Sequence, residues 1–209
     1  MIKAILFDMD GVLIEAKEWH YEALNKALDK FGMAISRDAH LTTYDGLPTR
    51  TKLKMLTKAH GLPEELHEFL NSLKQQYTIE MTASLCKPVF HHQYALSKLK
   101  GLGYKMGVCS NSVRTSVEGM MRFSKLDRYL DLQVSNEDVS KPKPDPEMYI
   151  KGMKELGVTP EETLILEDNE HGIKAARASG AHVLVIGTVD DVNFERISEK
   201  ISQINEHNS

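Results

Sequence analysis

Short apolar runs that stop at polar residues alternate with stretches of helical periodicity along most of this chain. The first run, residues 2–7, stops at the carboxylates of Asp8 and Asp10. Comparable runs follow at residues 104–109, 132–134, 163–166 and 183–186, and helical spacing separates them. Runs of this length and type are typical of parallel strands that helices cover on both faces. The alternation therefore predicts an α/β fold, with a doubly wound, Rossmann-like parallel sheet.

A second pattern interrupts the first directly after the opening run. Apolar residues recur at helical spacing from about residue 16 to Gly32, again from about Thr49 to Gly61, and again beyond Pro63. The face expected to be buried on the third helix comprises Leu66, Phe69, Leu70, Leu73 and Tyr77. We therefore expect a small all-helical domain over residues 16–84, inserted into an α/β core formed by residues 1–15 and 85–209.

Composition narrows the class of protein. The chain has 209 residues, 41% of them hydrophobic and 27% charged, and a formal net charge of −4. A net negative charge argues against non-specific binding to nucleic acid or to anionic membranes. The two cysteines, Cys86 and Cys109, are too few for a disulfide framework and fit a reducing compartment. No apolar run is long enough for a signal peptide or a membrane span, so we expect a cytoplasmic protein.

Polar groups follow four of the predicted strands. Asp8 and Asp10 end the first, Ser110 and Asn111 the second, Lys141 lies in the loop after the third, and Glu167 and Asp168 end the fourth. Alone, each would more often be a turn, a helix cap or a solvated charge. Because the carboxyl ends of parallel strands meet at one edge of a sheet, the groups should converge. Acids, a hydroxyl and a lysine together indicate a site for a phosphate and a divalent metal ion.

The same residues carry a resemblance that covers nearly the whole chain. The segment from Asp8 to Leu13, Ser110-Asn111, Lys141-Pro142, and Glu167-Asp168 followed by Gly172 resemble, in order, the four motifs of the haloacid dehalogenase-like hydrolase superfamily. The helical insert resembles the cap of its beta-phosphoglucomutase-like phosphatases. This resemblance implies that Asp8 is the nucleophile that forms an aspartyl-phosphate. It implies that Asp10 is the general acid and base, with a pKa raised in the substrate complex.

The resemblance also implies a cofactor and a set of binding residues. Mg²⁺ would be held by Asp8, the Asp10 carbonyl and Asp168, with Glu167 a less direct ligand. The phosphate would be bound by Ser110, Asn111 and Lys141. The insert would recognise the substrate through residues that face the closed site, namely His20, Gly46, Thr49 and Arg50. Lys74 is a further, weaker candidate for reaching the substrate.

Three functions compete at this point. The first is a Mg²⁺-dependent phosphatase that acts on a small phosphorylated metabolite such as a sugar or polyol phosphate. The second is a phosphoglucomutase-type isomerase, which would use the same motifs and return the phosphoryl group to the substrate. The third is a non-enzymatic receiver-like signalling module, which Asp10 and the long insert disfavour. We expect a monomer or weak homodimer, surface positions for His91 and His92, and an inert, buried Cys109.

Overall fold

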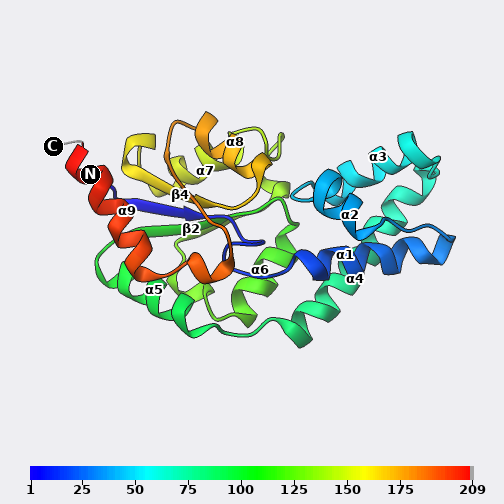
Figure 1. Ribbon diagram of the computed structural model, residues 1–209, viewed down its shortest axis with the longest axis horizontal. Coiled ribbons are helices and arrows are strands. Elements are labelled where there is room, and N and C mark those ends of the chain that lie inside the picture. Colours follow the sequence, from blue (N-terminus) through cyan, green and yellow to red (C-terminus); the bar gives the residue numbers. More distant parts are fainter. Residues whose placement is uncertain (208–209) are drawn as a thin grey trace.

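The computed structural model describes residues 1–207. Its core is a parallel sheet in the order β3-β2-β1-β4-β5 (Figure 1). The strands are β1 Ala4–Phe7, β2 Lys105–Cys109, β3 Leu132–Val134, β4 Thr163–Glu167 and β5 His182–Val185. The α/β fold expected from the alternating pattern is confirmed, and each strand lies within a residue or two of its predicted run.

The helices divide into two groups along the chain. The first group follows β1 and comprises α1 Lys17–Leu28, α2 Arg37–Ala39, α3 Thr49–His60 and α4 His67–Leu85. The core then contributes α5 Phe90–Gly101, α6 Arg114–Phe123, α7 Glu147–Leu156, α8 Glu170–Ala178 and α9 Phe194–His207. In Figure 1 the group α1–α4 extends to one side of the sheet, beyond the carboxyl end of β1. The predicted helical insertion after the first strand is therefore present.

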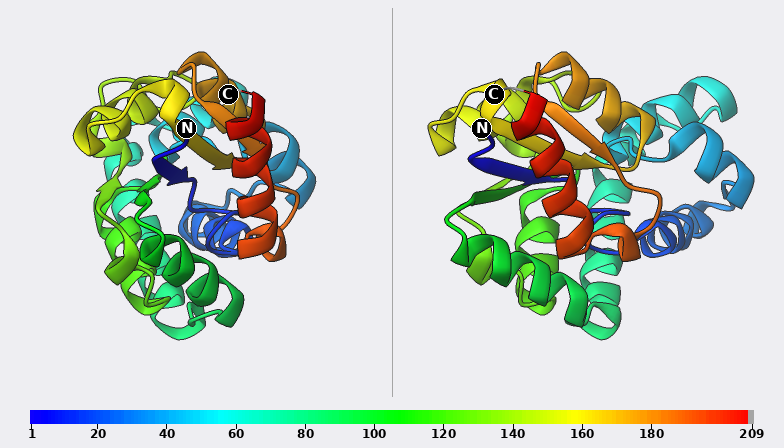
Figure 2. Two further views of the ribbon diagram at one scale, coloured as in Figure 1. Left: turned by 90° about the vertical axis from the view of Figure 1, so that its left-hand side faces the viewer. Right: turned by 60° about the vertical axis from the view of Figure 1, so that its left-hand side comes forward.

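The sheet is covered on both faces, because successive residues of β1 point to opposite sides. Ala4 and Leu6 pack with the buried side chains of α7 and α8. Ile5 and Phe7 pack with those of α5, α6 and α9. Figure 2 shows these two helical layers on either side of the strands. All four residues are fully buried, so any group that directly follows β1 is held by a rigid element.

The helical insert has an apolar core of its own. Leu24 and Leu28 of α1 pack with Leu53 and Leu56 of α3, and with further side chains of α3 and α4. The predicted buried face of α4 is partly wrong, because Phe69 is 56% exposed. The buried positions of this helix are Leu70, Lys74, Thr78 and Thr82. Three of those four are polar, so hydrophobic periodicity could not reveal this face.

Two further expectations can be judged from the fold. His92 is buried and its Nε2 lies 2.8 Å from the Val189 carbonyl, so its predicted surface position was wrong. Cys109 is buried, as expected for a core thiol. Among residues 1–207, helices that combine the length and the apolar character needed to cross a bilayer are not found.

Candidate active site

Asp8, Lys143 and Glu167 form a buried cluster at the carboxyl ends of β1 and β4. Asp8 directly follows β1, and its backbone N–H donates to the Leu166 carbonyl of β4 at 2.9 Å. The Lys143 amino group lies 2.6 Å from Asp8 Oδ1 and 2.7 Å from Glu167 Oε1. It also donates to the carbonyl of Cys109 at 2.8 Å. One buried cation therefore links the ends of three neighbouring strands.

Lys143 takes the place that we expected Lys141 to occupy, so that expectation was wrong. Lys141 is exposed, and its backbone N–H donates to Glu147 Oε2 at 2.9 Å. The Asn111 side chain explains the difference, because it holds the backbone of Lys143 on both sides. Asn111 Oδ1 accepts from the Lys143 N–H at 3.0 Å, and Asn111 Nδ2 donates to the Lys143 carbonyl at 3.2 Å. These two bonds fix residue 143 against β2, within reach of Asp8.

Asp10 is held by hydrogen bonds from both parts of the molecule. Its Oδ2 accepts from the Ser112 hydroxyl of the core at 3.0 Å, and His20 Nε2 of the insert lies 3.1 Å from its Oδ1. On the other side of the imidazole, Lys74 Nζ lies 3.0 Å from His20 Nδ1. Burial raises the pKa of Asp10, but the charge and hydrogen bond of His20, the Ser112 hydroxyl and the charge of Lys74 together leave it lower than usual. In this substrate-free protein the carboxyl is therefore ionised at neutral pH.

The Asp168 carboxylate lies beside Asp8, close to the turn that follows β1. Gly11 has a φ of +88°, and a Cβ at this position would come within 2.2 Å of Asp168 Oδ2. Glycine is thus needed here both for its backbone conformation and for the approach of Asp168. Asp168 Oδ2 forms an ion pair with Lys17 Nζ of α1 at 2.7 Å. Its Oδ1 is buried and accepts no hydrogen bond from residues 1–207.

These carboxylates fit a divalent cation. Oxygens of Asp8, Glu167 and Asp168 lie within 4.8 Å of one another. Burial and the neighbouring charge of Glu167 raise the pKa of Asp8 well above its usual value, in spite of Lys143. Burial likewise raises the pKa of Asp168 to about 6, against the opposing effect of Lys17. Carboxylates that repel one another in this way, together with the unsatisfied Asp168 Oδ1, form a donor set suited to Mg²⁺.

Glu167 has fewer free lone pairs than its neighbours. Besides the Lys143 amino group, its Oε1 accepts from the Tyr149 hydroxyl at 2.6 Å. Its Oε2 accepts from the backbone N–H of Asp168 at 3.0 Å. Glu167 is therefore anchored by the protein, whereas Asp8 and Asp168 keep more of their capacity to bind an ion.

The expected phosphate-binding and specificity residues surround the same space. Ser110 is buried and its hydroxyl accepts from the Ser112 N–H at 3.1 Å. Asn111 Nδ2 donates to the Gly46 carbonyl of the insert at 2.9 Å. Thr49 and Arg50 also line the cavity. The Arg50 guanidinium is exposed, however, and pairs with Glu68 at 3.1 Å rather than with a residue of the core.

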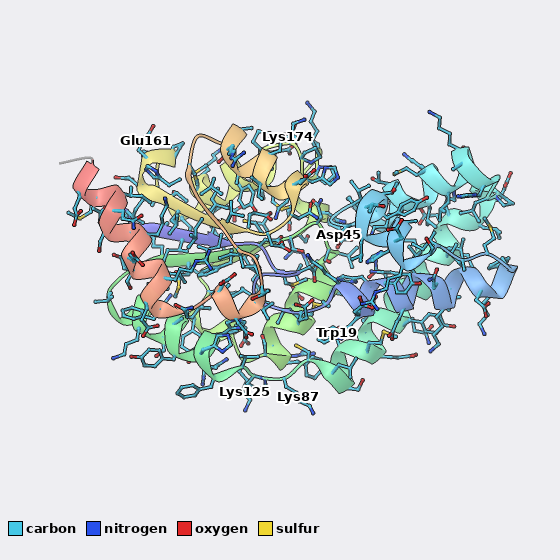
Figure 3. The ribbon with its side chains drawn as sticks, in the orientation of Figure 1. Trp19, Asp45, Lys87, Lys125, Glu161 and Lys174 are labelled. Atoms are coloured by element: carbon cyan, nitrogen blue, oxygen red, sulfur yellow. The ribbon has the colours of Figure 1, made fainter. Side chains whose placement is uncertain are left out.

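A single cavity of about 520 Å³ lies between the insert and the core, and its lining includes Asp8, Asp10 and Lys143. Asp168 is not part of this lining but lies directly behind it, beside Asp8 and Glu167. Asp45, in the loop before α3, marks this junction in Figure 3. Its Oδ2 accepts from Asn169 Nδ2 at 2.8 Å and lies 3.7 Å from Lys17 Nζ. The cavity is large enough for a small metabolite. The structure thus brings the sequence-predicted residues together around one space, apart from Lys141, with Asp168 placed next to the lining through its contact with Asp8 and Glu167.

Sequence reasoning missed several residues of this site. Lys143 begins the second of two Lys-Pro steps, so its local pattern is the same as that of Lys141. Ser112 lies one residue beyond the predicted Ser110-Asn111 pair. Lys17 and Tyr149 had no local signal, since both reach the site from helical positions that only the tertiary fold brings close.

Comparisons with known proteins show the family and the fold of this chain. A family model described as haloacid dehalogenase-like hydrolase matches residues 5–186. A phosphorylated carbohydrates phosphatase of Thermotoga maritima is 27% identical over 192 residues, which cover 92% of this chain and 88% of that protein. A phosphoglycolate phosphatase of Aquifex aeolicus is 27% identical over an alignment of 214 positions, which covers 99% of this chain and 98% of that protein. A crystal structure of beta-phosphoglucomutase from Clostridium difficile has the same fold, with a TM-score of 0.86 at 22% identity, and 99% of each chain is covered.

Proposed function

This chain belongs to the haloacid dehalogenase-like hydrolases, and we propose that it is a Mg²⁺-dependent phosphatase. Its substrate in this proposal is a small phosphorylated metabolite, a sugar or polyol phosphate. The reaction would pass through an aspartyl-phosphate on Asp8. The enzyme class, a phosphoric monoester hydrolase, is the one to which the similar curated proteins belong.

The observation that carries the proposal is the placement of two carboxylates with different surroundings in one cavity. Asp8 lies against the Lys143 amino group and beside Asp168, among groups that bind an anion and a cation. Asp10 lies instead against the imidazole of His20 and the hydroxyl of Ser112. A nucleophile and a proton-transfer group need such different environments.

In the proposed reaction, an oxygen of Asp8 attacks the phosphorus and the alkoxide leaves with a proton from Asp10. Asp10 then takes a proton from the water that hydrolyses the aspartyl-phosphate. The low pKa of Asp10 in the substrate-free protein means that it must gain its proton as the dianionic phosphate binds. His20 and Ser112 hold the carboxyl in position during both steps. Lys143 and the Ser110 hydroxyl would stabilise the negative charge that develops on the phosphoryl oxygens.

Asp8 and Asp168 would hold Mg²⁺, together with the carbonyl of Asp10 and, more weakly, Glu167. When bound, the ion would neutralise charge on the transferred phosphoryl group. Without it the phosphoryl group would face the carboxylates of Asp8 and Asp168 with Lys143 as the nearest buried counter-charge. The dependence on Mg²⁺ is therefore part of the proposal.

The helical insert, residues 16–84, would act as a cap that opens to admit substrate and closes to exclude water. The polar contacts across the cavity support this role, because Asn111 and Asn169 of the core bind the segment Asp45-Gly46 of the insert. The two free, buried cysteines support a reducing, cytoplasmic location as part of the same proposal.

A panel of phosphorylated metabolites tests the function directly. Each compound is incubated with Mg²⁺, and free phosphate and isomerised product are both measured. The phosphatase proposal predicts release of phosphate that is lost with a chelator and in Asp8→Asn. Formation of an isomer without net phosphate would instead identify a mutase. Lasting phosphorylation of Asp8 by acetyl phosphate, without turnover of any compound, would indicate a signalling module.

A further inference from the structure

The wall of the cavity that the insert contributes is strongly basic. Its lining residues include five cationic side chains and the single carboxylate of Asp45. The cationic residues are Lys17, Arg50, Lys52, Lys54 and Lys74. A wall of this kind attracts anions, in contrast to the acidic wall that the core provides around Asp8.

Two of the five cations on this wall, Lys52 and Lys74, are buried, and of these Lys52 has no partner at hydrogen-bond or ion-pair distance among the described residues. Lys17 pairs with Asp168 and Lys74 lies against His20. Lys52 is 94% buried, since only 6% of its surface is exposed. Within residues 1–207, Lys52 forms no ion pair shorter than 4.0 Å, and the carboxylates of Asp45 and Asp10 act on its charge from a greater distance. A buried charge without a partner costs stability, and it is normally found where a ligand supplies the counter-charge.

His40 is a second buried polar side chain in the same wall without a partner. It is 1% exposed, and neither of its ring nitrogens has a hydrogen-bond partner among the described residues. Burial and the neighbouring charge of Lys52 lower the pKa of His40 to about 4, so its imidazole is neutral at physiological pH. A neutral imidazole offers one N–H donor and one acceptor nitrogen. Both residues belong to the lining of the cavity, where Lys52 carries a charge without a close partner and the buried ring nitrogens of His40 have unused hydrogen-bonding capacity.

We propose that Lys52 and His40 form a subsite for a carboxylate of the substrate, so that the preferred substrates are phosphorylated sugar acids or hydroxy acids. This inference rests on the proposed phosphatase function and, among small phosphorylated metabolites, favours those with a carboxylate over neutral sugar and polyol phosphates. A carboxylate matches the subsite because it carries one negative charge, as Lys52 carries one positive charge. A second phosphate would bring more negative charge than Lys52 and a neutral His40 balance. The other cations of this wall are less suited to supply the difference, because Lys74 lies against His20, Arg50 pairs with Glu68, and Lys54 is exposed.

The subsite and the reacting groups share one cavity. Lys52 and His40 line the same space of about 520 Å³ as Asp8 and Asp10. One small metabolite in this cavity would therefore meet both the reacting groups and the subsite.

The matched substrates are phosphoglycerate and glycerol phosphate, which share a three-carbon skeleton and differ in a carboxylate. We expect a higher kcat/KM for phosphoglycerate. Lys52→Met should lower the ratio of the two kcat/KM values by about 10- to 100-fold, the effect of losing a charge-assisted hydrogen bond. Lys58→Met is the matched control, since Lys58 is an exposed residue of the same helix outside the cavity. An unchanged ratio in Lys52→Met, or preference for a sugar bisphosphate over phosphoglycerate, would overturn the carboxylate subsite.

Binding to the Asp8→Asn protein separates this inference from the proposed function. Calorimetry should show tighter binding of phosphoglycerate than of glycerol phosphate, and the Lys52→Met substitution in the same background should remove the difference. Equal binding of both compounds would refute the subsite even if the enzyme is a phosphatase. Tighter binding of phosphoglycerate without any turnover would support the subsite and refute the phosphatase function.

The stability of the ligand-free protein gives a readout that does not depend on substrate. Because Lys52 is buried without a counter-charge, Lys52→Met should raise the Tm, whereas Lys58→Met should leave it unchanged. A lower Tm for Lys52→Met would mean that the lysine stabilises the fold, and would contradict the idea that its charge awaits a ligand.

Discussion

At the scale of single residues, Lys143 is the lysine that reaches Asp8. Lys143→Met should lower kcat/KM by about 100- to 1000-fold, because it removes a preorganised cation from the phosphoryl site. Lys141→Met is the matched control. It removes the same charge from an exposed side chain that lies two residues before Lys143. Steady-state phosphate release with Mg²⁺ measures both. Equal losses in the two variants would contradict the geometry of the cluster.

The Asp168 carboxyl leads to a prediction on metal binding and pH. Mg²⁺ that binds the folded protein alone should raise its stability by about 2.7 kcal/mol at a free concentration about 100 times the Kd, or roughly 5–10 °C in Tm. Since burial raises the pKa of Asp168 to about 6, the carboxyl binds a proton below that pH and the ion must displace it. The shift in Tm should therefore be larger at about pH 8 than at about pH 5.

Asp168→Asn provides the control for this measurement. The variant should lose most of the Mg²⁺-induced shift in Tm at both pH values, as followed by thermal unfolding with circular dichroism. A full shift in Asp168→Asn, or a shift that grows as the pH falls, would place the ion elsewhere.

Site residues could be predicted from the sequence where they directly follow a strand. They could not be predicted where contacts between distant segments decide which side chain enters the site. Asp8 and Asp168 follow buried strands, so their positions could be predicted from the apolar runs before them. Two Lys-Pro steps have equal local patterns, and the choice of Lys143 depends on hydrogen bonds from Asn111. His40 and Lys52 had no signal, because their burial depends on how the insert packs.

At the scale of elements, the loop before α3 connects the insert to the core through Gly46. This residue has a φ of +69°, and a Cβ there would come within 2.6 Å of Asn169 Oδ1. Gly46→Ala should therefore displace the loop and lower kcat/KM by about tenfold, the effect of about 1.4 kcal/mol on the barrier. Kinetic assays together with thermal unfolding measure the two consequences.

Gly32 offers a matched control for that variant. Its φ is +66°, but a Cβ there would meet no atom within 4 Å. Gly32→Ala and Gly46→Ala should share a similar backbone cost of about 1 kcal/mol, because both place a side chain in the left-handed region. Only Gly46→Ala should slow catalysis. Equal activity in the two variants would argue against a role for the loop.

The helices and strands were well predicted where the spacing of apolar residues matches the side chains that are buried. All five strands and the long helices α1, α3, α5 and α7 follow from apolar spacing. The buried face of α4 did not, because this helix buries Lys74 and Thr78 in place of Phe69. Helix α9 carries Ile197, Ile201 and Ile204 on its buried side, a helical spacing that the sequence analysis did not use.

At the scale of the whole molecule, a rigid sheet edge and a separate helical layer enclose one cavity. Strands alternate with helices along the chain, and this alternation, which is visible in the sequence, predicts the parallel sheet that the structure has. The closure of the insert over the sheet follows from contacts between distant segments, such as Lys17 with Asp168 and Asn111 with Gly46. Such contacts explain why the general position of the site was predictable, while the residues on its far wall were not.

The central claim is that the phosphoryl group is transferred to Asp8. Acid quenching of the enzyme during turnover with Mg²⁺ and a hydrolysed substrate, followed by peptide mass spectrometry, tests it most directly. We predict one phosphoryl group on the peptide that contains Asp8, and none on that peptide in Asp8→Asn. A phosphoryl group on another residue, or turnover that persists in Asp8→Asn, would contradict the account.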